Sequence, residues 1–209
     1  MFINFIILLF LTLNIYSLES FDSQTVLEVK NKYGNKAYIR LAAWDKMLIK
    51  SKQAKTLKKL KYVNDFFNKI KYKTDMSHWH KNDYWATPIE FTGTAAGDCE
   101  DYAIAKYFAL LKVGIPEKKL RIAYVKLLSK RTKYEESHMI LTYYHKPNST
   151  PIVLDNVNKR LKLVSKRKDL KLIYSFNASG LYESKNIGKS QTKVGANKLY
   201  KWKNLVDKL

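Results

Sequence analysis

The segment GDCEDYAIA, residues 97–105, holds Cys99, the only cysteine of the chain, among acidic residues at positions 98, 100 and 101. Asp98 is a favourable N-cap, and the apolar spacing that follows predicts a helix over residues 99–113. Free backbone N–H groups and the positive end of the helix dipole favour a thiolate in the first helical turn. The segment therefore predicts a cysteine nucleophile, with an inert buried thiol as the alternative.

A cysteine nucleophile needs a general base, and the chain has four histidines. His138 opens a predicted strand over residues 138–144, and a strand backbone would hold the imidazole in one direction. Asp155 closes a short predicted strand, from which it could orient His138 across an antiparallel pair. The alternatives are a structural histidine and an aspartate that only begins a turn. The order Cys, His, Asp on a helix and two strands is typical of papain-like and transglutaminase-like enzymes.

The carboxylates beside Cys99 would raise the pKa of its thiol, so they need a counter-charge. Adjacent acids where a loop enters a helix can offer several oxygen ligands to a hard cation such as calcium. Alternatively, Asp98 only caps the helix, and Glu100 and Asp101 only suit the positive end of its dipole. Spacing alone leaves both interpretations open.

The elements that must position these residues follow from hydrophobic periodicity. Amphipathic helices are predicted over residues 30–47 and 55–72, followed by an irregular loop over 73–97. Strands are predicted after the central helix, over residues 120–128, 138–144, 152–155 and 172–176. Helices first and antiparallel strands afterwards indicate an α+β fold.

The two ends of the chain differ from its middle. Residues 2–16 form an apolar run without charge, which predicts a signal peptide over residues 1–19 or an uncleaved N-terminal anchor. No second run is as long, so we expect no membrane span in the mature protein. A domain over residues 20–183 and a Lys-rich tail over 184–209, loosely ordered or packed on the domain, complete the predicted organisation.

The chain carries a formal net charge of +21, from 39 Lys and Arg against 18 Asp and Glu. A charge of this size suits nucleic acid, an anionic membrane surface or an acidic partner. The lysines are scattered, however, and no nucleic-acid-binding motif accompanies them. We therefore expect a solvated basic surface and no nucleic-acid partner.

Four segments together resemble one known family. They span roughly residues 82–182 and read DYWATPIEFTGTAAGDCEDYAIAKYFALLKVGIPEKKLRIAYVKL, SHMILTYY, PIVLDNVN and LIYSFNASGLY. They look like the LapG-type bacterial transglutaminase-like cysteine proteinases. The resemblance implies a transglutaminase-like variant of the papain fold, with N-terminal helices packed on an antiparallel sheet. It also implies that Cys99 is the nucleophile, His138 the general base and Asp155 the residue that orients His138.

The same resemblance implies a calcium-dependent endopeptidase in the periplasm of a Gram-negative bacterium. Such an enzyme would cut a large surface adhesin near its N-terminus and so release cells from biofilms. An inner-membrane receptor for cyclic di-GMP would hold it inactive. The resemblance favours Asp98 and Glu100 as calcium ligands, with Asp101, Asp83 and backbone carbonyls of residues 92–97 as weaker candidates.

The oxyanion donors are less well defined. The backbone N–H of Cys99 is one expected donor, and the indole N–H of Trp85 is a second, unless Trp85 only packs beneath the loop. Two other functions stay open. One is a transglutaminase or amidase of the same fold, and the other is a non-catalytic basic protein that binds an anionic polymer or membrane surface.

Overall fold

The computed structural model describes residues 18–128, 134–183, 192–195 and 199–209. Almost all of the predicted signal peptide or anchor, and much of the predicted tail, lies outside these ranges. The N-terminal half is helical, and its helices are α1 (Ser23–Tyr33), α2 (Asn35–Lys52), α3 (Thr56–Phe67), α4 (Asp75–Trp79), α5 (Pro88–Thr94) and α6 (Cys99–Lys112). The short strands β1 (Lys71–Tyr72) and β2 (Ala96–Gly97) pair in parallel.

The prediction of one helix over residues 30–47 is wrong, because the chain breaks at Gly34. This glycine has φ +78°, in the left-handed region that residues with a Cβ rarely adopt, and it separates α1 from α2. The second predicted helix ends early, at Phe67, before the chain turns into β1. The supposed loop over 73–97 contains α4 and α5, and Thr87 caps α5 through a capping box with Glu90.

The second half of the chain forms an antiparallel sheet. Within the described residues its order is β6-β5-β4-β3-β7-β8-β9. The strands are β3 (Leu120–Leu128), β4 (Glu135–Tyr143), β5 (Ile152–Leu154), β6 (Lys162–Leu163), β7 (Leu170–Asn177), β8 (Gly180–Glu183) and β9 (Thr192–Gly195), with 3₁₀ turns η1 (Glu117–Lys119) and η2 (Val164–Lys166). The predicted strand over 120–128 is confirmed residue for residue. The strand predicted over residues 138–144 was wrong at its start. Strand β4 begins at Glu135, so His138 lies inside the strand rather than opening it.

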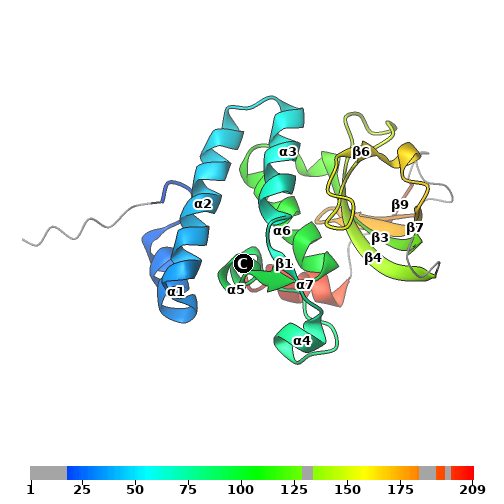
Figure 1. Cartoon of the computed structure of the whole chain (residues 1–209). Coiled ribbons are helices and arrows are strands. Elements are labelled where there is room, and N and C mark those ends of the chain that lie inside the picture. The colour runs from blue at the N-terminus through cyan, green and yellow to red at the C-terminus, as the bar shows by residue number, and fades with distance from the viewer. Residues whose placement is uncertain (1–17, 129–133, 184–191, 196–198) are drawn as a thin grey trace, which may run out of the picture.

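Helix α6 lies between the two halves (Figure 1). It packs against α3 and α5 on one side and against β4 and β3 on the other. Its side chains Ile104, Ala105 and Leu110 are fully buried in the main hydrophobic core. The predicted α+β fold, with N-terminal helices packed on an antiparallel sheet, is confirmed, and the helix that begins with Cys99 is its central element.

Helix α7 (Tyr200–Val206) belongs to the Lys-rich segment at the end of the chain. Its Trp202 is 5% exposed and stacks on Phe108 of α6, with ring centroids 5.7 Å apart and an interplanar angle of 8°. Lys201 forms an ion pair with Asp83. None of the helices within the described ranges combines the length and the apolar composition that a bilayer crossing requires.

Candidate active site

Cys99 is the first residue of α6, as the sequence predicts. Asp101 fixes the turn that presents it, because its two carboxylate oxygens accept backbone N–H groups, Oδ2 from Asp98 at 3.2 Å and Oδ1 from Ala86 at 2.9 Å. A Cβ on Gly97 would collide with Asp101 and Phe91, so this close approach requires glycine. The GDC segment is therefore locked between the preceding loop and the helix.

The structure brings His138 and Asp155 together. Strands β4 and β5 are antiparallel, with Leu141 opposite Leu154, so Asp155 emerges just beyond the paired residues, on the side of His138. His138 Nε2 lies 2.9 Å from Asp155 Oδ1, and both residues are buried. Because Asp155 occupies Nε2, Nδ1 is the ring nitrogen left to take a proton from a nucleophile.

Cys99 meets the same strand. Helix α6, which Cys99 begins, packs on β4, and the backbone N–H of Met139, the residue after His138, lowers the pKa of the Cys99 thiol. The thiol itself donates to Glu100 Oε2 at 3.0 Å. Burial, and after it the charge of Glu100, raises the pKa of the thiol above its ordinary value, while the Met139 N–H works in the opposite direction. Without a cation the structure therefore favours the protonated thiol.

A buried arginine, Arg167, completes the surroundings of Asp155, and the sequence analysis missed it. Its guanidinium lies 2.8 Å from Asp155 Oδ2 and 2.8 Å from Asp169 Oδ2. Burial opposes ionisation of Asp155, but His138, the N–H of Val157 and Arg167 together hold its pKa well below the usual range. Arg167 sits in the basic run SKRKDL, where nothing separates it from surface lysines.

We expect Arg167→Met to lower the free energy of unfolding by about 3 kcal/mol, because it leaves the Asp155 carboxylate buried without its cation. Urea denaturation measures the change. Lys168→Met is the matched control, since Lys168 is an exposed neighbour in the same segment. A loss no larger than that of Lys168→Met would show that the ion pair contributes little.

A buried lysine supports Asp155 from the helical side. Lys106 of α6 is fully buried and donates to Asn68 Oδ1 at 2.8 Å, and Asn68 Nδ2 donates to the backbone oxygen of Asp155 at 2.9 Å. Burial lowers the pKa of Lys106 to about 7. The lysine thus links helix α6 to the segment that carries Asp155.

The lowered pKa of Lys106 makes stability depend on pH. Between pH 7 and the ordinary lysine pKa, the folded protein releases a proton that the unfolded chain keeps, so stability rises with pH. The wild type should gain about 2 kcal/mol relative to Lys106→Met from pH 7 to 9. Urea denaturation at both pH values tests this, with Lys58→Met on the exposed face of α3 as control. Equal pH dependence in wild type and Lys106→Met would contradict it.

Five carboxylates cluster around the thiol. Ligand atoms of Asp98, Cys99 and Glu100 lie within 4.8 Å of one another, as do those of two further groups, Asp75–Asp83–Glu100 and Asp75–Asp98–Asp101. Burial, followed by the charge of Glu100, raises the pKa of Asp98 to about 10, and burial also raises that of Asp75. Three of the five, Asp75, Asp98 and Asp101, are largely buried, and so much negative charge there is unfavourable without a cation.

The free oxygens of this cluster suit a cation. Among the described residues, Oδ1 of Asp98 and Oδ1 of Asp75 are buried and have no hydrogen-bond partner. Calcium takes several carboxylate oxygens in a loosely constrained arrangement, so these residues fit it. Asp101 is less available because backbone N–H groups occupy both its oxygens, and Asp83 is paired with Lys201.

Asp75 is the member of the cluster that the sequence analysis missed. It begins α4, inside the segment predicted to be irregular, and lies 23 positions before Asp98 in the chain. Its only sequence signal is that it is an acid in a strongly basic chain. Pairing of β1 with β2, which precede α4 and α6 respectively, brings Asp75 to the carboxylates at the start of α6.

The surroundings of Trp85 fit both roles predicted for it, a packing residue and an oxyanion donor. It is 5% exposed and stacks on Phe176, with centroids 5.9 Å apart, as expected for a packing residue. Its Nε1 is buried, and no described residue accepts its hydrogen. The indole N–H is therefore an unused donor, and its role toward an oxyanion stays a prediction.

A thiol at a helix start, beside a strand that carries a histidine paired with a buried aspartate, defines a papain-like or transglutaminase-like cysteine enzyme. A family model described as bacterial transglutaminase-like cysteine proteinase matches residues 38–174. The chain belongs to this family, as the sequence resemblance indicates.

Three solved structures of LapG from Legionella pneumophila are similar to this chain, and each covers 88% of it. The calcium-bound form has 36% sequence identity, a TM-score of 0.74 and 97% of its own chain covered. The EGTA-treated form has 35% identity, a TM-score of 0.75 and 96% covered. A third structure has 35% identity, a TM-score of 0.75 and 94% covered. A comparison with curated proteins found no match.

Proposed function

We propose that this protein is a calcium-dependent cysteine endopeptidase with Cys99 as nucleophile, His138 as general base and Asp155 as the residue that orients His138. One observation carries the proposal. Helix α6, which begins with Cys99, packs on β4, the strand that carries His138, and Asp155 holds the imidazole of His138 at 2.9 Å. This arrangement supports the pairing of nucleophile, base and orienting acid that thiol proteolysis requires.

In the proposed reaction His138 takes the proton of Cys99, and the sulfur attacks a peptide carbonyl. The N–H groups at the start of α6, together with Trp85 Nε1, would stabilise the oxyanion. His138 then protonates the leaving amine, and an acyl-enzyme remains. His138 next activates a water molecule that releases the acyl group. Asp155 and Arg167 keep the imidazole in one orientation throughout.

Calcium would be held by Asp98 and Glu100, with Asp75 as a further ligand and Asp101 and Asp83 at the edge of the cluster. When bound, the ion supplies positive charge that cancels the field of the carboxylates on the thiol. Glu100, engaged with the ion, would no longer accept the hydrogen of Cys99, which is then available to His138. The calcium-bound structure of the similar LapG supports this ion.

The substrate in this proposal is a large surface adhesin, cut near its N-terminus, which releases cells from a biofilm. We place the enzyme in the periplasm, exported by residues 1–19, with an inner-membrane cyclic di-GMP receptor as its inhibitor. Membership in the family and similarity to LapG support these assignments. A transglutaminase or amidase would share the acyl-enzyme and differ only in the acceptor.

The experiment is to incubate the protein with the N-terminal fragment of a large adhesin from the same organism, in calcium or in EGTA. We expect one cut in calcium, located by N-terminal sequencing of the product, and none in EGTA. Cys99→Ala protein is the control for contaminating proteases. Incorporation of an added amine without cleavage would favour the transglutaminase instead, and cleavage that persists in EGTA would remove calcium from the proposal.

A further inference from the structure

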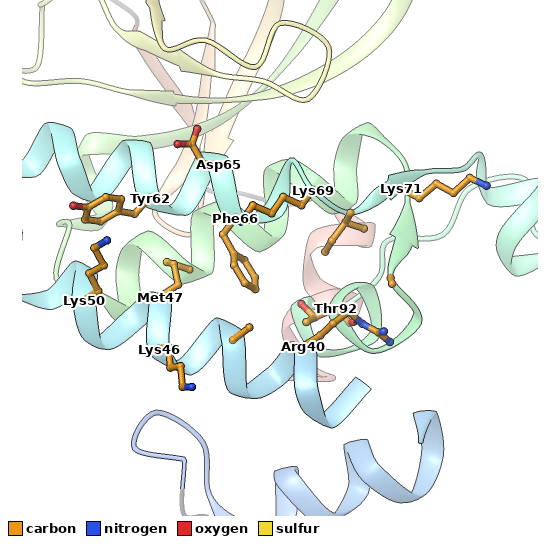
Figure 2. Close-up of a pocket in the computed structure, with 13 residues that line it drawn as sticks. Arg40, Lys46, Met47, Lys50, Tyr62, Asp65, Phe66, Lys69, Lys71 and Thr92 are labelled. Atoms are coloured by element: carbon orange, nitrogen blue, oxygen red, sulfur yellow. The ribbon is translucent and has the colours of Figure 1, made fainter. Parts of the chain in front are cut away.

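A groove separate from the thiol runs between α2 and α3 (Figure 2). Its volume is about 720 Å³, and its apolar side chains include Met47, Phe66 and Ile70. Basic side chains line it from α2 and from the chain that follows α3. They are Arg40, Lys46, Lys50, Lys69 and Lys71. We call this feature the α2–α3 groove.

The charge of the α2–α3 groove is not balanced from within. In the part of the chain that the structure describes, none of its five basic residues has a carboxylate within 4.0 Å. The single acid among the lining residues, Asp65, is paired with Lys61 one turn earlier on α3. The groove therefore offers several unpaired positive charges around an apolar floor.

Parts of the α2–α3 groove are held in place. At one end of the groove, the guanidinium of Arg40 donates to the backbone oxygen of Thr92 at 2.8 Å and also to that of Gly93. These two hydrogen bonds hold the guanidinium in place. At the other end of the groove, the Lys50 ammonium lies over the Tyr62 ring, 4.5 Å from its centroid (Figure 2). A ligand would meet these cations without first having to order them, which lowers the entropic cost of binding.

The α2–α3 groove leads toward the nucleophile. Its lining continues through Lys71 and Ala95 at the start of the β1–β2 pair. There Lys71 pairs with Ala96 and Tyr72 with Gly97, two residues before Cys99. An extended chain cleaved at Cys99 and passing along β1 would thus reach the groove. This continuity favours a segment of the substrate as occupant over a second copy, which would bring its own charge of +21.

We propose that the α2–α3 groove is an exosite that binds an acidic segment of the protein substrate, with its carboxylates on the lysines and an apolar side chain on Met47 and Phe66. The exosite rests on the proposed endopeptidase function and extends it, because it selects substrates by a segment outside the cleaved bond. It would raise affinity for the whole substrate without changing the chemistry at Cys99.

The first test measures binding alone. A fluorescent peptide of alternating aspartate and leucine is titrated into Cys99→Ala protein in the presence of calcium. We expect Lys46→Glu combined with Lys69→Glu to weaken binding about tenfold or more. Lys36→Glu with Lys58→Glu, exposed lysines of α2 and α3 outside the groove, makes the same change in net charge and should have little effect. Equal weakening by both pairs would overturn the exosite.

Two further probes distinguish specific binding in the groove from general attraction between opposite charges. A peptide with serine in place of leucine keeps the charge and should bind more weakly, because it lacks the contact with the apolar floor. Single-stranded DNA should displace the leucine peptide poorly. Displacement by DNA at equal phosphate and carboxylate concentration would mean a general polyanion surface, and would overturn the proposal.

The second test uses kinetics. With the adhesin fragment as substrate, Lys46→Glu combined with Lys69→Glu should raise KM about tenfold and leave kcat unchanged. The same variant should cleave a short peptide that spans the cut at the wild-type rate. A parallel loss on both substrates would contradict an exosite. If no adhesin fragment is cleaved while the binding test succeeds, the proposed substrate is wrong but the groove still binds acidic peptide.

Discussion

Cys99→Ala will abolish cleavage of the adhesin fragment, and adding His138→Ala to it will cost nothing more. Residues that act as one catalytic unit are non-additive, so each single change should lower kcat by roughly 10⁵-fold or more, and the double change by the same factor. The hydrogen bond between His138 and Asp155, together with the packing of α6 on β4, supports the proposal that Cys99 and His138 act as one unit. Initial rates in saturating calcium measure the effect.

His145→Ala is the matched control for that experiment, because His145 is exposed just beyond β4 and should leave the rate unchanged. Thermal unfolding of each variant separates loss of chemistry from loss of fold. If His138→Ala kept a rate within about tenfold of wild type, another group would have to serve as general base. Additive losses in the double variant would mean that Cys99 and His138 act independently.

Asp98→Asn and Glu100→Gln will each weaken the response to calcium. In the proposed calcium site each change would replace a charged ligand with a neutral one, so the calcium concentration for half-maximal activity should rise about 100-fold. Calcium titration of the cleavage rate measures the shift. Asp207→Asn, at an exposed acid near the end of α7, is the control.

Glu100→Gln has a second and opposite expected effect. In EGTA the charge of Glu100 raises the pKa of Cys99, next to the larger effect of burial. Removing that charge should lower the thiol pKa, so iodoacetamide should modify Glu100→Gln faster than wild type at pH 8 in EGTA. Addition of calcium should accelerate wild type and change the variant little. A wild-type thiol that reacts at the same rate in calcium and in EGTA would contradict the role given to the ion.

Local patterns predicted the elements that carry the chemistry. The capping residue Asp98 and the following apolar spacing located α6 within one residue, and alternation located β3 over residues 120–128. The meeting of His138 with Asp155 was predictable because adjacent antiparallel strands bring their ends together. These inferences needed contacts only within one element or between neighbouring strands.

The residues that were missed depend on contacts distant in sequence. Asp75 reaches Asp98 only because β1 pairs with β2, and both strands are two residues long. Arg167 looks like its lysine neighbours until burial places it on Asp155. The break at Gly34 was missed because the apolar spacing behind that prediction, from Ala37 to Leu48, lies entirely after the glycine. Periodicity reports which face is buried and does not report what lies opposite that face.

The hydrogen bond from Cys99 to Glu100 also bears on how the protein survives oxidation. The thiolate, and not the thiol, attacks peroxides and disulfides, and the chain has no second cysteine that could rescue an oxidised one. With burial and Glu100 raising its pKa, the thiol stays protonated and reacts slowly with oxidants. The acidic cluster thus protects the sulfur from oxidation while no cation is bound. A bound cation would remove that protection and would favour the thiolate that the proposed reaction needs.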